Sequence, residues 1–509
     1  MHATPPKATR REWTGLAVLA LPCLLYSMDL TVLNLAIPHL SADLRPSPSQ
    51  LLWIVDIYGF LLAGFLIPMG TLGDRIGRRR LLLSGAAAFG AASILAAFAA
   101  SPAMLIAARA LLGVAAATLA PSTLSLIRNM FADPRERTFA IGVWISSFSA
   151  GGAVGPLIGG AVLEHFWWGS VFLLAVPIMA ALLAAGPMLL PEFRDPHPGR
   201  IDLASALLSL ATVLAVIYGF KHIAAYGPDP QALAAIAGGL AVGALFLRRQ
   251  HRLADPLIDP ALFRRPGFGA ALAVNVLALF SAFGLFLLIA QYLQLVLGMG
   301  PLQAGLWTAP SGLAFVAGSM AAPALVRRVP PARLIAGSFL LSAAGFAVLT
   351  QAGGSHPLAT LMAGYLLFCL GLAPIGTLTT DMVVSLAPPH RAGAASGLSE
   401  TSFEFGGALG IAVLGSISAL AYRKLMAGPL AAAGLPERAG DTLGGTAAHA
   451  AALPAAQGEP LLAAAREAYT QSFSLAAAIC AAMAVAAAAL AWRLLRNAPM
   501  AGGAAQAGH

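Results

Sequence analysis

Residues 70–82 of the 509-residue chain read GTLGDRIGRRRLL, a short polar stretch between two apolar runs. Asp74 is followed by four arginines within six residues, and Gly77 between them permits a tight turn. The apolar runs on either side, 51–72 and 80–99, are each about 20 residues long, enough for an α-helix to cross ~30 Å of hydrocarbon. The stretch is therefore predicted to be a turn between two membrane-spanning helices.

Apolar runs of the same length recur along almost the whole chain. Because backbone polar groups in lipid must be satisfied within the segment, all of these runs are predicted to be α-helical. Fourteen spans are predicted, at residues 14–38, 51–72, 80–99, 103–127, 138–163, 168–190, 202–220, 231–247, 268–296, 302–326, 332–352, 358–386, 395–421 and 471–495. The fold class is thus an all-α integral membrane protein, and little chain is left for a soluble catalytic domain.

Composition agrees with a membrane protein and excludes several other classes. The chain is 59% hydrophobic and 10% charged, whereas soluble domains carry roughly 25% charged residues. The net charge of +9 does not indicate a nucleic-acid partner, because the basic residues form short clusters between apolar runs. Cys23, Cys369 and Cys480 lie inside apolar segments without disulfide or metal-ligand spacing, so we predict that they are small hydrophobic residues and that no metal is bound.

The distribution of basic residues predicts the orientation. If the N-terminus is cytoplasmic, 23 of the 30 lysines and arginines fall in cytoplasmic loops, six fall outside and Arg109 alone lies in a span. This asymmetry predicts that both termini are cytoplasmic and that the number of spans is even. The first apolar run lacks a clear cleavage site and is expected to be retained as a helix.

Two proline-broken polar segments divide the chain into six, two and six spans. We predict an N-terminal six-helix bundle at 1–190, a two-helix insertion at 191–250, and a C-terminal six-helix bundle at 251–509 with a cytoplasmic tail. Within the last part, the Ala-, Gly- and Pro-rich segment 422–470 is expected to be an extracytoplasmic loop, flexible or partly helical.

Two further segments place unusual residues inside spans. Residues 105–113 (LIAARALLG) carry Arg109, a charge that is costly in a membrane unless it faces a polar interior. Residues 151–160 (GGAVGPLIGG) combine small residues, which let helices approach closely, with a proline that permits a bend. Each segment alone could have a purely structural role.

Taken together, these segments resemble motifs of the major facilitator superfamily, in the order that the family requires. Residues 70–82 resemble its signature loop, residues 105–113 its embedded-arginine motif, although Leu112 stands where glutamine is usual, and residues 151–160 the motif of its exporters. The stretches MDLTVLNLAIP at 28–38 and WIVDIY at 53–58, with fourteen spans, resemble the fourteen-helix drug:proton antiporters of quaternary-ammonium and multidrug exporter type.

The resemblance implies a fold and a set of conformational residues. Two six-helix bundles would enclose a central cavity, with two extra helices at the side. Asp74 and the arginines after it would clasp neighbouring helix ends in one conformational state. The residues implied in conformational change are Gly70, Asp74, Arg75, Gly77, Arg78, Arg109, Gly151, Gly155, Pro156, Gly159 and Gly160.

Four acids within the spans are the candidates for proton coupling and substrate binding: Asp29, Asp56, Glu400 and Glu404. An ionised carboxylate in hydrocarbon is costly unless it is paired or neutralised, so such groups usually face a cavity and carry protons or cations. Glu400 and Glu404 lie one helical turn apart and repel each other, although neighbouring hydroxyls could simply cap them. Asp29 has no basic residue within its own span and is expected to be unpaired. Another acid, Asp381, is expected to be a structural partner of Arg391.

We therefore predict a proton-coupled antiporter that exports lipophilic or cationic drugs or antibiotics. It would be a monomer in the bacterial inner membrane, would contact lipid, protons and small-molecule substrates, and would bind no nucleic acid. No phosphate-binding loop is found, so no cofactor is expected and the proton gradient would supply the energy.

Three alternatives remain open: an exporter dedicated to one endogenous metabolite or antibiotic, a proton-coupled nutrient importer and an intramembrane enzyme. The sequence contains no HExxH motif or comparable nucleophile–base arrangement, so an enzyme is not predicted.

Overall fold

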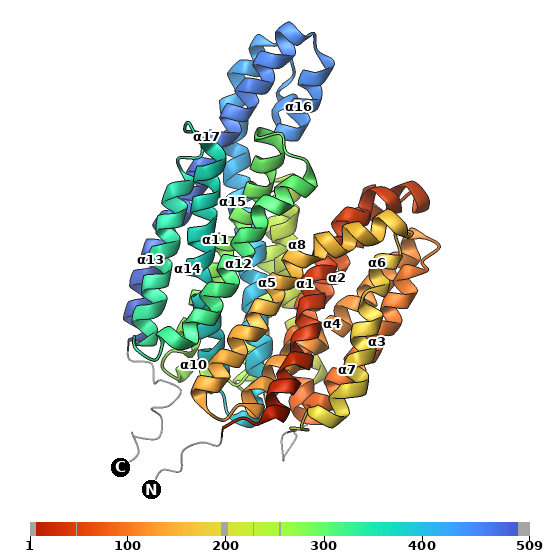
Figure 1. Cartoon of the computed structure of the whole chain (residues 1–509), viewed down its shortest axis with the longest axis vertical. Helices are drawn as coiled ribbons and strands as arrows, with labels where there is room; N and C mark the ends of the chain where they lie inside the picture. The colour runs from red at the N-terminus through yellow and green to blue at the C-terminus, as the bar shows by residue number, and fades with distance from the viewer. Residues whose placement is uncertain (1–6, 47, 195–201, 228, 254–255, 497–509) are drawn as a thin grey trace.

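The computed structural model describes residues 7–46, 48–194, 202–227, 229–253 and 256–496, and within these ranges it contains helices and no β-strand (Figure 1). The helices of the N-terminal part are α1 (Arg10–Leu44), α2 (Pro48–Ile76), α3 (Arg78–Ala97), α4 (Pro102–Met130), α5 (Pro134–His165), α6 (Ser170–Leu173), α7 (Ala175–Leu189), α8 (Leu203–Tyr226) and α9 (Pro230–Gln250). Those that follow are α10 (Pro260–Arg264), α11 (Phe268–Gln291), the π-helix η1 (Tyr292–Val296), α12 (Pro301–Leu325), α13 (Pro331–Leu349), α14 (Pro357–Leu386), the 3₁₀ turn η2 (Pro389–Arg391), α15 (Ala392–Ala432), the 3₁₀ turn η3 (Glu437–Gly440), α16 (Leu443–Ala452) and α17 (Ala455–Leu495).

Each of the fourteen predicted spans lies on a helix of the structure. Span 168–190 is formed by α6 and α7 together, and span 268–296 by α11 and η1. Within the described ranges, 12 helical segments are long and apolar enough to cross a membrane, and α1 and α12 are not among them. The all-helical membrane fold is confirmed, while the number of fourteen spans stays a prediction.

Several helices begin where the sequence supplies a cap. Asp133 precedes Pro134 and accepts a hydrogen bond from the backbone nitrogen of Arg135 at 2.8 Å. Asp229 and Pro230 start α9 in the same way. An acidic cap satisfies backbone donors that the helix leaves free, and proline at the first position has no donor to lose. Loop acids therefore fix where the helices begin.

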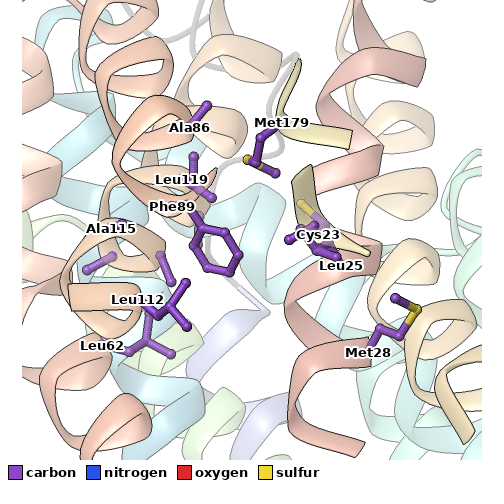
Figure 2. Close-up of a cluster of buried hydrophobic side chains, with 14 of the residues drawn as sticks. Cys23, Leu25, Met28, Leu62, Ala86, Phe89, Leu112, Ala115, Leu119 and Met179 are labelled. Atoms are coloured by element: carbon purple, nitrogen blue, oxygen red, sulfur yellow. The ribbon is translucent and has the colours of Figure 1, made fainter. Parts of the chain in front are cut away.

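Two separate apolar cores hold the molecule together. The first is built mainly from α1 to α7, and the second from α11 to α17. Figure 2 shows part of the first core, where the Phe89 ring of α3 points into the space between α1, which carries Cys23 and Leu25, and α4, which carries Leu112. All three cysteines are free and buried, as expected for small apolar side chains. The predicted boundaries of the three parts stay predictions, because residues 195–201 and 254–255 lie outside the described ranges.

The inserted helices α8 and α9 form a pair at the side of the two bundles. α8 packs against both α2 and α15, whereas α9 packs on α8. Asp202, which caps α8, accepts two hydrogen bonds from Arg249 of α9, at 2.8 and 3.1 Å. These bonds hold the pKa of the Asp202 carboxyl well below its usual range. The inserted pair is thus tied together at one end and reaches both bundles through α8.

Segment 422–470 is more ordered than the sequence suggests. α15 continues to Ala432 and α17 begins at Ala455, with η3 and α16 between them. Tyr422 donates a hydrogen bond to Thr446 at 2.9 Å, and Met426 and Leu430 are buried beside Gly440 of η3. Alanine favours helix strongly, so an alanine-rich segment with an apolar face can fold on itself. The segment forms a helical projection that extends beyond the other helices, at the end opposite the termini (Figure 1).

Candidate functional site

Asp29 and Arg109 form an ion pair inside the first bundle. Asp29 on α1 accepts a hydrogen bond from Arg109 on α4, with 2.6 Å between Oδ2 and Nη1. The Arg109 side chain is fully buried, and its Nε donates to the backbone oxygen of Ile54 at 3.2 Å. The expectation that Asp29 is unpaired is therefore wrong: its partner comes from another span, which inspection of the first span alone cannot reveal.

Two tyrosines extend this pair towards the second bundle. The Arg109 guanidinium lies over the Tyr58 ring, 4.6 Å from its centroid, in a cation–π contact. The Tyr58 ring lies 6.2 Å from that of Tyr26, and the Tyr26 hydroxyl donates to Glu404 at 2.6 Å. Tyr26 is on α1 and Glu404 is on α15, so this hydrogen bond crosses from one bundle to the other. No sequence motif identified Tyr26.

Glu400 lies one turn before Glu404 and is buried, with 9% of its surface exposed. Its Oε1 atom has no hydrogen-bond partner among the described residues. The nearby hydroxyls do not cap either glutamate through the hydrogen bonds that the structure resolves, because Thr401 donates to the backbone oxygen of Gly397 and Ser402 to that of Ser399. A buried carboxylate oxygen without a partner is costly, so this site favours a proton or a cation.

Asp56 of α2 has a different partner from the other candidate acids. It forms an ion pair with Lys221 of α8. The sequence prediction ended this span at residue 220 and placed Lys221 in an outer loop, but α8 continues to Tyr226. Basic residues usually mark the end of a span. Here Lys221 lies within the helix, and its charge is paired with Asp56 of α2.

The predicted turn at 70–82 is shorter in the structure, because α2 continues to Ile76 and α3 begins at Arg78, so that only Gly77 separates the two helices. This stretch, still called the turn at 70–82, caps a helix of the other bundle. The two Asp74 carboxylate oxygens accept hydrogen bonds from the backbone nitrogens of Gly393 and Ala394, both at 2.9 Å. These donors begin α15, where the helix dipole favours a negative charge. Gly70 allows this approach, because a Cβ atom there would collide with the backbone oxygen of Gly393. The predicted contact between Asp74 and a neighbouring helix end is present.

The arginines that follow Asp74 donate hydrogen bonds to backbone oxygens of other segments. Arg78 is buried, pairs with Asp74 at 2.6 Å and donates to the backbone oxygen of Pro389 at 2.7 Å. Arg79 donates to the backbone oxygens of Pro187 and Leu190, at 3.2 and 3.0 Å, where α7 ends. Gly77 has a φ of 113°, which disfavours any side chain. Arg75, the remaining predicted residue of the turn, is partly buried.

A second polar contact joins the bundles at the same end and was not predicted. Arg137 of α5 pairs with Asp381 of α14 at 2.9 Å, and Thr138 donates to the other Asp381 oxygen at 2.7 Å. The expected partner of Asp381, Arg391, instead lies 3.7 Å from Asp259. A basic residue in a predicted loop gave no reason to pair it with an acid 244 positions away.

The glycines of α5 divide into two sets. A Cβ atom at Gly151 would collide with the backbone of Leu24, and one at Gly159 would lie 2.6 Å from Val32, so these two allow α5 to pack closely on α1. Gly152 and Gly160 have open space instead. Gly155 is buried, and the side chain of Pro156 lies outside what the structure describes. Close packing on α1 thus explains Gly151 and Gly159 and does not explain Gly152 and Gly160.

Comparison with known proteins agrees with this arrangement. The family model of the Major Facilitator Superfamily matches residues 19–411. The multidrug efflux pump LfrA of Mycolicibacterium smegmatis is 45% identical over 95% of this chain and 97% of its own length. The methyl viologen resistance protein SmvA of Salmonella typhimurium is 35% identical, over 92% and 94% of the two chains. The puromycin resistance protein pur8 of Streptomyces alboniger is 35% identical over 80% and 82%.

Solved structures give the same fold. The human organic anion transporter MFSD10 matches with a TM-score of 0.58, over 93% of this chain and 99% of its own, at 17% identity. That identity supports the fold alone. With the family model covering most of the chain and relatives aligned over nearly its full length, this chain belongs to the major facilitator superfamily.

Proposed function

We propose that this protein exports lipophilic cations across the bacterial inner membrane in exchange for protons. Relatives that align over nearly the whole chain are named for multidrug efflux and for resistance to methyl viologen, a dication. Carboxylates within membrane helices provide the countercharge that such substrates need. The proposal includes a monomeric transporter that needs no cofactor, with both termini in the cytoplasm.

The observation that carries the proposal is the pair of glutamates at the contact between the bundles. Glu404 is held by Tyr26 of the opposite bundle, while Glu400 Oε1 is buried without a partner among the described residues. When the bundles separate, Glu404 loses its tyrosine and both acids become reachable. A proton and a cationic substrate can each neutralise these carboxylates, and one carboxylate cannot hold both at once. Competition of this kind couples the two movements.

The contacts at the turn give the conformational part of the cycle. Asp74, Arg78 and the Arg137–Asp381 pair all join the bundles at the end where the described termini lie, and the bundles diverge towards the opposite end (Figure 1). With the termini in the cytoplasm, this is the state closed to the cytoplasm. Substrate uptake requires these contacts to break, and rocking of the bundles would expose the acids to each side in turn.

Export can be tested in an efflux-deficient host that expresses the chain. We expect raised resistance to methyl viologen and ethidium, and ethidium efflux that stops when a protonophore collapses the proton gradient. An ionophore that dissipates only the sodium gradient is the control and should leave efflux unchanged. Sensitivity of the expressing cells equal to that of the empty host for every cationic compound would contradict cation export.

A second function is favoured by one relative. The pur8 protein is named for resistance to a single antibiotic, puromycin, and is 35% identical to this chain, as SmvA is, over a smaller share of the two chains. Export dedicated to one antibiotic is therefore the alternative. A susceptibility panel separates the two, because a dedicated exporter would raise resistance to one structural class only.

A further inference from the structure

Lys221 is one of three lysines in the chain, and the only one of them on an inserted helix. It lies on α8, which packs against α2 of the first bundle and α15 of the second. Its ammonium forms the ion pair with Asp56 of α2 and lies 4.8 Å from the centroid of the Phe60 ring, one turn further along the same helix. The Lys221 ammonium therefore makes an ion pair with a carboxylate and a cation–π contact with an aromatic ring.

A carboxylate beside an aromatic ring is the environment that proteins use to bind quaternary ammonium groups. The neighbouring Phe220 packs against Phe405 of α15, with 5.9 Å between ring centroids, which fixes α8 on that side. The lysine thus occupies a position that has the chemistry of a cation-binding site.

The pair is open enough to exchange. The Lys221 and Asp56 side chains are 37% and 24% exposed, in contrast to the fully buried Arg109. A lysine side chain can swing its charge away on a flexible four-carbon stem. A cationic ligand that reached Asp56 could displace it.

We propose that Lys221 is a built-in competitor of the substrate: it neutralises Asp56 when the site is empty, and a cationic substrate must displace it. Lys221 is then a residue that sets affinity and specificity. It lowers the apparent affinity for every cation that needs Asp56, so that only cations held strongly by charge or by aromatic contact bind. This inference rests on the proposed export of cations. It predicts that removal of the lysine charge raises the affinity for cations.

A purely structural role makes a different prediction. If the pair only fixes α8 on α2, loss of the charge lowers thermal stability and leaves cation affinity unchanged. Replacement by arginine would keep both the charge and the pair. The two roles are therefore separated by affinity, with stability measured on the same samples.

The experiment uses the full chain, purified in lipid nanodiscs, with ethidium as monocation and methyl viologen as dication. Dissociation constants are measured by fluorescence and calorimetry for the wild type, Lys221→Gln and Lys221→Arg. Ethidium and methyl viologen should both bind Lys221→Gln about three- to tenfold more tightly, because the same competing state is removed for each. Lys221→Arg should bind like the wild type. Lys424→Gln, at an exposed lysine of α15, is the matched control and should change nothing.

Asp56→Asn tests whether the gain acts through the pair: in that background, Lys221→Gln should have no further effect on affinity. Should Lys221→Gln fail to fold, Lys221→Met keeps the apolar stem against Phe60 and provides the same measurement. Unchanged or weaker ethidium binding in the charge-free variant, or equal tightening in Lys221→Arg, overturns the inference while cation binding by the wild type stands. Absence of binding in the wild type and every variant overturns the inference together with the proposed function.

Discussion

Asp29 shows how far a single residue can be understood from its own helix. A membrane acid without a nearby base is expected to be neutral, but Arg109 of α4 reaches it. The arginine is the fully buried member of the pair and depends more on a charged partner, because its charge cannot be removed by deprotonation. Asp29 therefore pairs with the charge of Arg109, and in the proposed function it would also be available to a proton or a cation.

Asp29→Asn should damage both stability and transport. Removal of one member of a buried ion pair leaves the other charge uncompensated, at a cost on the order of 3 kcal/mol. We expect a lower melting temperature in detergent and cation efflux reduced to near the background of the empty host. Thermal unfolding and ethidium efflux measure the two effects.

The double variant Asp29→Asn with Arg109→Gln is the control. Because the unpaired charge is gone, it should recover much of the melting temperature without recovering efflux. A single Asp29→Asn variant with wild-type stability and wild-type uphill efflux would show that the pair has neither role.

Tyr26→Phe isolates one hydrogen bond between the bundles. The phenyl ring keeps the edge contact with Phe148, at 5.5 Å between centroids, and Glu404 loses its donor. A hydrogen bond to a charged group contributes about 1.5–3 kcal/mol, so we expect a change in cation affinity of about tenfold or more and a shift in the pH dependence of efflux.

Tyr365→Phe is the matched control for the Tyr26 change, because Tyr365 packs among aromatic rings of the second bundle. Identical pH profiles for Tyr26→Phe and the wild type would mean that the hydrogen bond to Glu404 has no part in coupling.

At the level of helices, the contact between Asp74 and the start of α15 is the clearest interaction that depends on the conformational state. A carboxylate at a helix N-terminus interacts with free backbone donors and with the dipole, together worth up to about 2 kcal/mol in partly buried sites. Here the acid belongs to one bundle and the helix to the other, so the capping energy is available only in the closed state.

Asp74→Asn should therefore favour opening at this end, because asparagine keeps only one of the two oxygens that accept from Gly393 and Ala394 and loses the charge paired with Arg78. We expect faster labelling of a cysteine introduced near the start of α15 by a membrane-impermeant reagent in inverted vesicles, and slower net transport. Asp133→Asn, at a cap within a single helix that uses one carboxylate oxygen, is the control because asparagine keeps that acceptor. Unchanged labelling and transport in Asp74→Asn would remove this contact from the cycle.

The helices themselves were largely predictable, and their partners were not. Hydropathy runs locate the membrane helices because lipid imposes both length and internal hydrogen bonding. The helical position of Lys221 was not predicted, because a charge is typical of the end of a span. The packed helices of segment 422–470 were not predicted either, because an alanine-rich composition is also typical of a loop. The candidate acids were found by their cost in lipid, whereas Tyr26, Arg137 and the pairing of Asp29 depend on which helices lie side by side.

At the level of the whole protein, two polar contacts hold the bundles together at one end. Arg137 and Asp381 are both nearly buried, unlike the looser Arg391–Asp259 contact. We expect Arg137→Asp or Asp381→Arg alone to abolish export, and the double exchange to restore part of it. Asp259→Asn should have little effect, because exposed pairs contribute about 0–1 kcal/mol. Failure of the exchange to restore any efflux, with both proteins folded, would count against a latch.

The orientation of the molecule gives a further expected outcome. Reporter fusions at residue 445, in α16 of the helical projection, and at the C-terminus should report opposite sides of the membrane, with the C-terminus cytoplasmic. The same side for both would mean that the number of spans is wrong.

The helical projection has a mechanical consequence. α15 and α17 are each 41 residues long, about 60 Å at 1.5 Å per residue, roughly twice the thickness of the hydrocarbon core. Each acts as a lever whose far arm stands outside the lipid, so a tilt of the second bundle by about 10° would move the tip by about 10 Å. A fluorophore or a binding protein attached at the tip would turn a small rotation inside the membrane into a displacement that can be followed in real time.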